Sequence, residues 1–159
     1  MAIRNIREMG DDILRKKSRE VTEMTPKIRE LISDMYDTLY ESMGVGLAAP
    51  QVGILKRIVV IDVEEGNPYT LINPEILETR DTQTGGEGCL SVPGKAGKVT
   101  RPAYVRARAL DENMQPYELE GEGLLARAIC HELDHLEGIL YVDRVEGELY
   151  DAEMEEDED

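Results

Sequence analysis

Residues 121–138, GEGLLARAICHELDHLEG, constrain the fold of this chain more than any other stretch. Apolar residues recur along it at helical intervals, which predicts an amphipathic helix that stops at Gly138. The apolar positions are Leu124, Leu125, Ala128, Ile129, Leu133 and Leu136. The same helix carries His131 and His135, the only two histidines in the sequence, and a four-residue spacing brings them to one face. The chain must therefore pack one helix into a core while two imidazoles meet beside it.

The string HELDH, residues 131–135, matches the pattern in which two helical histidines share one metal ion and the intervening glutamate acts as general base. Such strings also arise by chance in Glu-rich helices, as histidines on a polar face. Because these are the only histidines in the chain, we favour a metal site with Glu132 beside the ion.

A hydrolytic metal site needs a third protein ligand and an open position for water. Cys89 is the natural candidate, because a thiolate is a strong ligand and the surrounding GGEGC, which we expect to be a turn, lets the backbone approach an ion. Cys130 points about 100° away from His131 on the helix, and we expect it to pack as a half-buried thiol. Two cysteines are too few for a disulfide scaffold, and a nucleophilic Cys89 would lack a histidine base.

The remaining pattern predicts one α+β domain, residues 1–145, in which antiparallel β-sheets pack around the central metal-binding helix. An N-terminal amphipathic helix is predicted between Pro26 and Gly44. Strands are predicted at residues 57–63, at 103–110 and, as two pieces broken at Asn73-Pro74, within 69–81.

Charge and hydropathy exclude several classes of function. The net charge of −16 argues against binding to nucleic acid or anionic lipid, which need clustered Lys and Arg. Residues 146–159 hold nine acidic residues and no basic one, so we expect an acidic C-terminal tail that is partly disordered. No apolar run approaches the roughly 18 residues of a membrane span, and no signal segment is visible. We expect a cytoplasmic protein that does not bind membranes.

Residues 44–53, GVGLAAPQVG, join the predicted first helix to the strand at 57. Taken in order, GVGLAAPQ, EGCLS and HELDHLEG resemble the three signature motifs of the bacterial-type, iron-dependent peptide deformylases. The resemblance extends from the N-terminal segment to about residue 145. It implies a hydrolase that removes the formyl group from the N-terminal formylmethionine of newly synthesised proteins and releases formate.

The resemblance also implies roles for individual residues. The metal would be Fe(II), with Zn, Ni or Co able to substitute in purified protein. Glu132 matches the general base, Gln51 the side-chain donor to the oxyanion, and Leu90 the backbone donor that aids it. The implied metal ligands are Cys89, His131 and His135.

A methionine side chain in the substrate needs an apolar slot, and core packing is the alternative role for each slot candidate. The candidates are Val45, Ala128 and Ile129. Gly46 and Gly88 would present backbone groups to an extended peptide. Glu87 and Arg101 are expected to pair and fix the imidazoles, with a surface ion pair as the alternative.

Two features depart from better-known members of the family. Where some carry an arginine that meets the substrate backbone, this chain has VPGKAGKV, so Lys95 or Lys98 is the candidate. The acidic C-terminus lacks the basic helix through which bacterial members dock on the ribosome, so we expect at most a transient ribosome contact, and a monomer. The competing hypotheses are a zinc peptidase of the HExxH type and a non-catalytic, metal-stabilised binding module.

Overall fold

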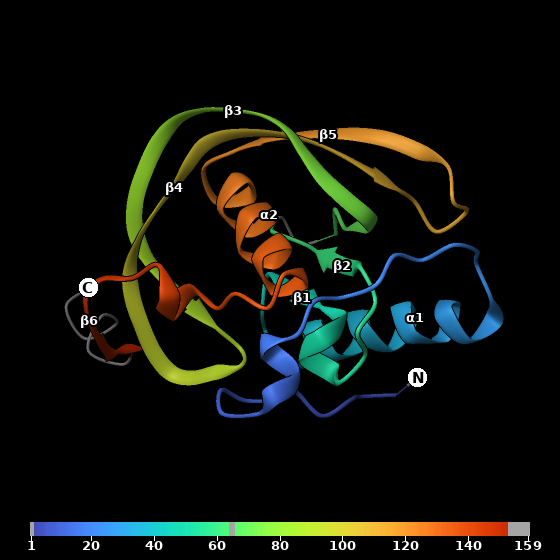
Figure 1. Ribbon diagram of the computed structural model, residues 1–159, viewed down its shortest axis with the longest axis horizontal. Helices are drawn as coiled ribbons and strands as arrows, with labels where there is room; N and C mark the ends of the chain where they lie inside the picture. Colours follow the sequence, from blue (N-terminus) through green and yellow to red (C-terminus); the bar gives the residue numbers. More distant parts are fainter. Residues whose placement is uncertain (1, 64–65, 153–159) are drawn as a thin grey trace.

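Helix α2 (Gly123–Leu136) lies at the centre of the fold, and the long strands β3 (Tyr69–Cys89) and β4 (Val92–Leu110) curve around it (Figure 1). The computed structural model describes residues 2–63 and 66–152. Within them the secondary structure is α+β and antiparallel, which confirms the predicted class. The helix follows strand β5 (Pro116–Glu122) directly, without an intervening loop.

The strands form one sheet in the order β1-β2-β3-β4-β5, and β6 pairs with β4 beside this path. Every pairing between these strands is antiparallel. The strands are β1 (Gly46–Ala48), β2 (Ile58–Ile61), β3 (Tyr69–Cys89), β4 (Val92–Leu110), β5 (Pro116–Glu122) and β6 (Glu146–Asp151). Three short 3₁₀ helices complete the described part: η1 (Asp12–Arg15), η2 (Ala49–Val52) and η3 (Tyr141–Asp143).

Helix α1 (Pro26–Glu41) follows the sequence pattern closely. The Thr25 side chain accepts a hydrogen bond from the Ile28 N–H at 3.1 Å, and Pro26 occupies the first turn, where its missing N–H costs nothing. The predicted amphipathic helix is confirmed, and its apolar face is buried against β1 and β2.

Strand β2 joins the two main parts of the core. Val59 and Ile61 pack in the cluster with α2, while Ile58 and Val60 pack in the cluster with α1. All four are fully buried, because successive side chains of a strand point to opposite faces and each face is covered by a helix. The short strand thus ties the metal-bearing helix to the N-terminal one.

Strand β3 runs unbroken from Tyr69 to Cys89, so the predicted interruption at Asn73 is wrong. Asn73 instead adopts a left-handed backbone (φ 51°) at a register shift, and its side-chain amide bonds both the N–H and the C=O of Val21 at 2.8 Å. Asn tolerates this conformation better than most residues, so the Asn-Pro signal produces a bulge within the strand. The stretch before Cys89 is likewise strand, and the turn follows at residues 90–91.

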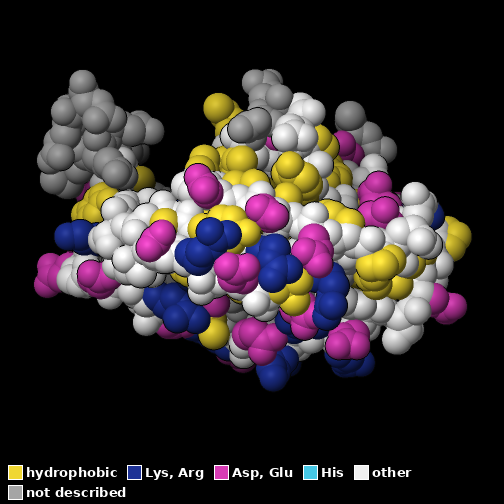
Figure 2. All heavy atoms as spheres, turned by 90° about the horizontal axis from the view of Figure 1, so that it is seen from above, with side chains coloured by type: hydrophobic (Ala, Val, Ile, Leu, Met, Phe, Trp, Pro, Cys, Tyr) yellow, Lys and Arg dark blue, Asp and Glu magenta, His cyan; other side chains and the backbone are white. Residues whose placement is uncertain are grey.

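The outer face of the sheet carries charges of both signs. Figure 2 shows Lys and Arg interspersed with Asp and Glu on this side, with no patch of a single sign. Arg106 on β4, for example, donates to Glu118 on β5 at 2.9 Å and to Glu78 on β3 at 3.4 Å. Opposite charges on neighbouring strands favour the observed register.

The C-terminal region differs from the expected tail. Glu146–Asp151 form β6, which pairs with β4, and Leu149 packs against buried Val99 and Tyr141. The acidic composition of the segment obscured this apolar contact. Residues 153–159 lie outside the described part of the chain. Among residues 2–63 and 66–152, no helix has the length and apolar character needed to cross a membrane.

Gly138 should be irreplaceable for two separable reasons. Its backbone is left-handed (φ +77°), and a Cβ would lie 2.5 Å from the carbonyl oxygen of Arg15. Gly94 has nearly the same φ (+76°) with nothing within 4 Å of an added Cβ. We expect Gly94→Ala to cost about 1–2 kcal/mol in the free energy of unfolding, and Gly138→Ala at least about 1–2 kcal/mol more. Urea unfolding would measure both, and equal losses would contradict the predicted clash.

Candidate metal site and its pocket

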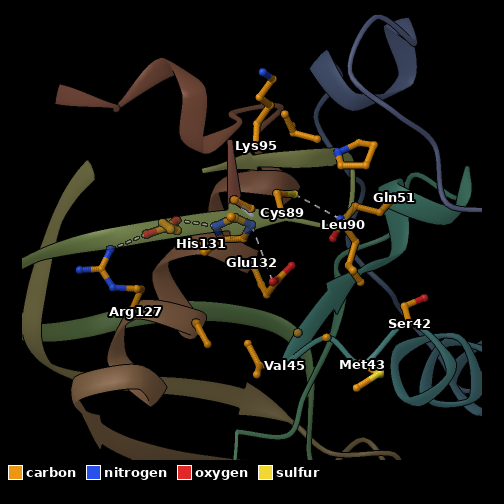
Figure 3. Close-up of a pocket in the computed structure, with 18 of the residues that line it drawn as sticks. Ser42, Met43, Val45, Gln51, Cys89, Leu90, Lys95, Arg127, His131 and Glu132 are labelled. Carbon is orange, nitrogen blue, oxygen red and sulfur yellow. Dashed lines mark hydrogen bonds and ion pairs between the residues drawn. The ribbon is translucent and has the colours of Figure 1, made fainter. Parts of the chain in front are cut away.

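Cys89, His131 and His135 converge between the end of β3 and helix α2. Figure 3 shows Cys89 beside His131. The Nε2 atom of His135 lies 3.3 Å from Sγ of Cys89 and 3.3 Å from Nε2 of His131. One candidate ligand atom from each of the three side chains lies within 4.8 Å of the others. A thiol and two imidazoles at this separation are a donor set suited to a divalent transition metal.

The local fold explains why these three groups meet. His131 and His135 are four residues apart on α2 and so occupy one face of it. Glu87 and Cys89 are two residues apart at the end of β3, and alternate residues of a strand share a face. Glu87 and Cys89 therefore both point toward α2. The Glu87 carboxylate contacts His131, and the Cys89 thiol lies beside His135.

Glu87 orients His131. Its Oε1 accepts a hydrogen bond from Nδ1 of His131 at 2.5 Å and one from Nη2 of Arg101 at 2.6 Å. With Nδ1 engaged, the Nε2 atom of His131 is the one that faces the cluster. Burial opposes ionisation of Glu87, but the hydrogen bonds from His131 and Arg101 outweigh it and hold the pKa of the carboxyl far below its usual range.

His135 is held in the form that binds metals. Burial lowers the pKa of His135 well below its ordinary value, and the neighbouring His131 lowers it further. The imidazole is therefore neutral near pH 7, with a nitrogen lone pair available to an ion.

Glu132 is a buried carboxyl group beside the cluster. Its Oε2 lies 4.0 Å from Nε2 of His131, and its Oε1 has no hydrogen-bond partner among the described residues. Burial raises the pKa of Glu132 to about 7. A carboxyl with a raised pKa that faces a pocket is suited to accept and return a proton near neutral pH.

Gln51 turns its amide nitrogen toward Cys89. Its Oε1 accepts a hydrogen bond from the Ala48 N–H at 3.0 Å, which fixes the orientation of the amide. Its Nε2 then donates to Oγ of Ser91 at 3.0 Å and approaches Sγ of Cys89 at 3.6 Å. The side chain is buried, so this donor is fixed before any ligand arrives.

A cavity of about 630 Å³ opens next to these groups. It is lined by the polar or ionisable side chains of Gln51, Cys89 and Glu132 and by exposed apolar side chains, among them Met43 and Leu124. The predicted residues that line it are Val45, Gly46, Glu87, Gly88, Leu90, Lys95 and Ala128. Such a cavity suits an extended peptide with an apolar side chain.

Four positions singled out from the sequence need comment. Ile129 is fully buried in the core between α2 and the sheet and is not among the residues that line the cavity, so it belongs to packing. Lys98 does not line the cavity either, while Lys95 does and pairs with Asp151 at 2.6 Å. Cys130 is buried more completely than expected, and burial raises the pKa of its thiol to about 11.

The sequence-based reasoning missed three residues around the site. Ser91 accepts the Gln51 amide, and the Tyr141 ring stacks on that of His131 with centroids 6.1 Å apart. Arg127 donates to Oε2 of Glu87 at 2.6 Å. The spacing of Arg127, four residues before His131, could have indicated a shared helix face, whereas nothing in the sequence indicated Tyr141.

Comparisons with known proteins, by sequence and by structure, find peptide deformylases. The polypeptide deformylase family model matches residues 3–149. The peptide deformylase of Agathobacter rectalis is 67% identical over 156 residues, covering 98% of both chains. That of Lachnoclostridium phytofermentans is 65% identical over 163 residues, covering 98% of this chain and all of its own. The crystal structure of a peptide deformylase from Legionella pneumophila superposes with a TM-score of 0.89 at 43% identity, covering 91% of this chain and 87% of that one.

The Glu87 carboxylate should give the fold a characteristic acid sensitivity. Because its pKa is lowered on folding, its contribution is complete above the ordinary value of 4.5 and is lost as the pH falls below that value. At pH 7, Glu87→Gln should cost about 3–5 kcal/mol in the free energy of unfolding, since two arginines lose their counter-charge.

The difference between wild type and Glu87→Gln should shrink steadily from pH 5 to pH 3. Urea unfolding of the metal-free proteins across this range would measure it. A difference that stays constant with pH would show that Glu87 does not titrate as the contacts require.

Proposed function

This chain belongs to the polypeptide deformylase family, and we propose which of its residues carry out the reaction. It is a metal-dependent hydrolase that removes the N-formyl group from nascent N-formylmethionyl peptides and releases formate. One observation carries the assignment of residues: the Cys89, His131 and His135 cluster opens onto a peptide-sized cavity, with the buried Glu132 carboxyl beside it.

Cys89, His131 and His135 would hold the ion, which we propose is Fe(II) in the cell. The donor set fits a borderline-soft divalent metal, and Zn, Ni or Co would also be accepted by one thiolate and two imidazoles. When bound, the ion supplies a Lewis acid that polarises the formyl carbonyl and makes a nearby water more acidic. Three protein ligands leave a position open for the reacting groups.

The protein's own residues would then manage the proton and the developing charge. Glu132 accepts the proton of the attacking water and later returns it to the departing amine, a role for which a pKa near 7 is suited. The Gln51 amide, fixed by Ala48 and Ser91, donates to the oxygen on which negative charge develops. The backbone N–H of Leu90, in the turn after Cys89, is proposed as the second donor.

Substrate binding is assigned to the walls of the cavity. Gly46 and Gly88 would pair with the extended peptide as an added strand. Val45 and Ala128, which line the cavity, would contact the methionine side chain. Lys95 remains a candidate contact to the peptide backbone, with its charge already shared with Asp151.

The cellular setting is part of the proposal. We expect a cytoplasmic monomer that meets its substrates as they leave the ribosome. We expect at most a transient contact with the ribosome, because residues 146–159 carry nine acidic residues and no basic one.

Replacement of Glu132 tests the assignment of the general base. Glu132→Gln keeps the size and removes the basic oxygen, so formate release from formyl-Met-Ala-Ser should fall at least ~10²-fold while metal content stays near that of wild type. The protein should be purified anaerobically and loaded with Fe(II) or Ni(II), with metal content measured on the same samples. Near-normal turnover in Glu132→Gln would exclude this role.

Gly46 tests how closely Glu132 must be placed. A Cβ at Gly46 would lie 2.7 Å from Oε2 of Glu132, although the backbone there is not left-handed. Gly46→Ala should therefore displace the carboxylate and lower kcat by about 10–100-fold with little change in thermal stability. Gly85→Ala is the matched control, because its Cβ would meet only Nη2 of Arg127 at 3.6 Å. Equal activity of the two variants would contradict the prediction.

A further inference from the structure

Arg127 connects the wall of the substrate cavity to a ligand of the metal. It lies on α2 one turn before His131 and is among the residues that line the cavity. Its side chain is only 10% exposed. A buried arginine in this place needs an explanation, because burying a guanidinium is costly unless its charge is paired.

The guanidinium is held by two acceptors behind the cavity wall. Nη1 of Arg127 donates to Oε2 of Glu87 at 2.6 Å and to the carbonyl oxygen of Val99 at 3.2 Å. Oε1 of the same carboxylate accepts from Nδ1 of His131 at 2.5 Å. Figure 3 shows this chain of contacts from Arg127 through the carboxylate to His131. Glu87 thus bridges two residues on one face of α2.

The other contacts of Glu87 show what Arg127 adds. Arg101 approaches from β4 and makes its short bond, 2.6 Å, to Oε1, the oxygen that also serves His131. Its bond to Oε2 is longer, at 3.2 Å. Without Arg127, Oε2 would keep only this longer bond, so the carboxylate would be held less firmly at that oxygen. A looser carboxylate would orient the hydrogen bond that Oε1 accepts from His131 less precisely.

The stem of Arg127 has a second role, separable from that of its head. Arginine can lay its methylene groups along an apolar surface while the guanidinium is bound elsewhere. Here the head is bound to Glu87 and Val99, and the side chain contributes to the cavity wall near Ala128 and Leu124.

We propose that Arg127 is a positioning residue that fixes His131 for metal binding through Glu87, while its stem forms part of the wall that receives the substrate side chain. The inference rests on the proposed metal site. It goes beyond that site by making one residue responsible for both the hold on the metal and the shape of the cavity.

Three substitutions of Arg127 separate the role of the guanidinium from that of the methylene stem. Arg127→Met keeps a stem of similar length and removes the guanidinium, so it should weaken metal retention about tenfold while KM for formyl-Met-Ala-Ser stays within about twofold. Arg127→Ala removes the stem as well, and KM should rise by about fourfold for each methylene lost from the wall. Arg127→Lys, which can reach Glu87 with a single donor, should retain metal better than Arg127→Met.

The measurements are Zn(II) affinity by competition with a chelator and KM and kcat of the Ni(II)-loaded proteins. Arg106→Met is the control, because Arg106 forms comparable ion pairs on the outer face of the sheet and should match wild type. Thermal unfolding identifies any variant that has lost its fold, in which case Arg127→Lys carries the test.

The outcomes are distinct. Weaker metal retention in Arg127→Met, with KM preserved and Arg106→Met unaffected, supports the proposal. Equal metal affinity in wild type and Arg127→Met overturns it and leaves the assigned metal site intact. Failure of the wild-type protein to bind metal would overturn the metal site itself, and this inference with it.

Discussion

The contact on which the rest of the structure depends is the bond between the buried carboxylate of Glu87 and the imidazole of His131. It joins the end of β3 to the middle of α2, and Arg101 brings β4 to the same point. A single buried charge would be strongly unfavourable, and the bidentate arginine contact is what makes it tolerable. Once Glu87 is fixed against α2, strand alternation places Cys89 at the histidines, so the ligand cluster follows from one ion pair.

The surroundings of helix α2 also show where the site lowers the stability of the fold. An aliphatic core surrounds α2 on the side that faces β2 and β4, and that side stabilises the helix. Beside this core the helix also buries Glu132, one of whose oxygens has no hydrogen-bond partner among the described residues. An unpaired buried carboxyl lowers stability unless it is protonated, and that balance is what brings its pKa near neutrality. Gly46 is needed because any side chain there would occupy the space of the carboxylate.

Local signals in the sequence predicted much of this. Helical periodicity indicated both helices, and the spacing within HELDH indicated that two imidazoles share a face. The errors have physical causes that a single sequence does not display. Asn73 could bond to Val21 only because the fold brings a distant segment to it, so a presumed break became a bulge. The acidic segment after residue 145 forms a strand because β4 offers a partner and Leu149 an apolar contact. Arg127 was missed because its function depends on Glu87, forty residues away.

The central claim is that one thiolate and two imidazoles from these positions bind the metal, and X-ray absorption spectroscopy tests it most directly. The zinc-loaded protein should show one sulfur neighbour at about 2.3 Å and two imidazole nitrogens at about 2.0–2.1 Å. The sulfur signal should disappear in Cys89→Ser and persist in Cys130→Ser, whose thiol is buried in the core. A metal without a sulfur neighbour in wild type, or a sulfur that survives in Cys89→Ser and vanishes in Cys130→Ser, would contradict the account.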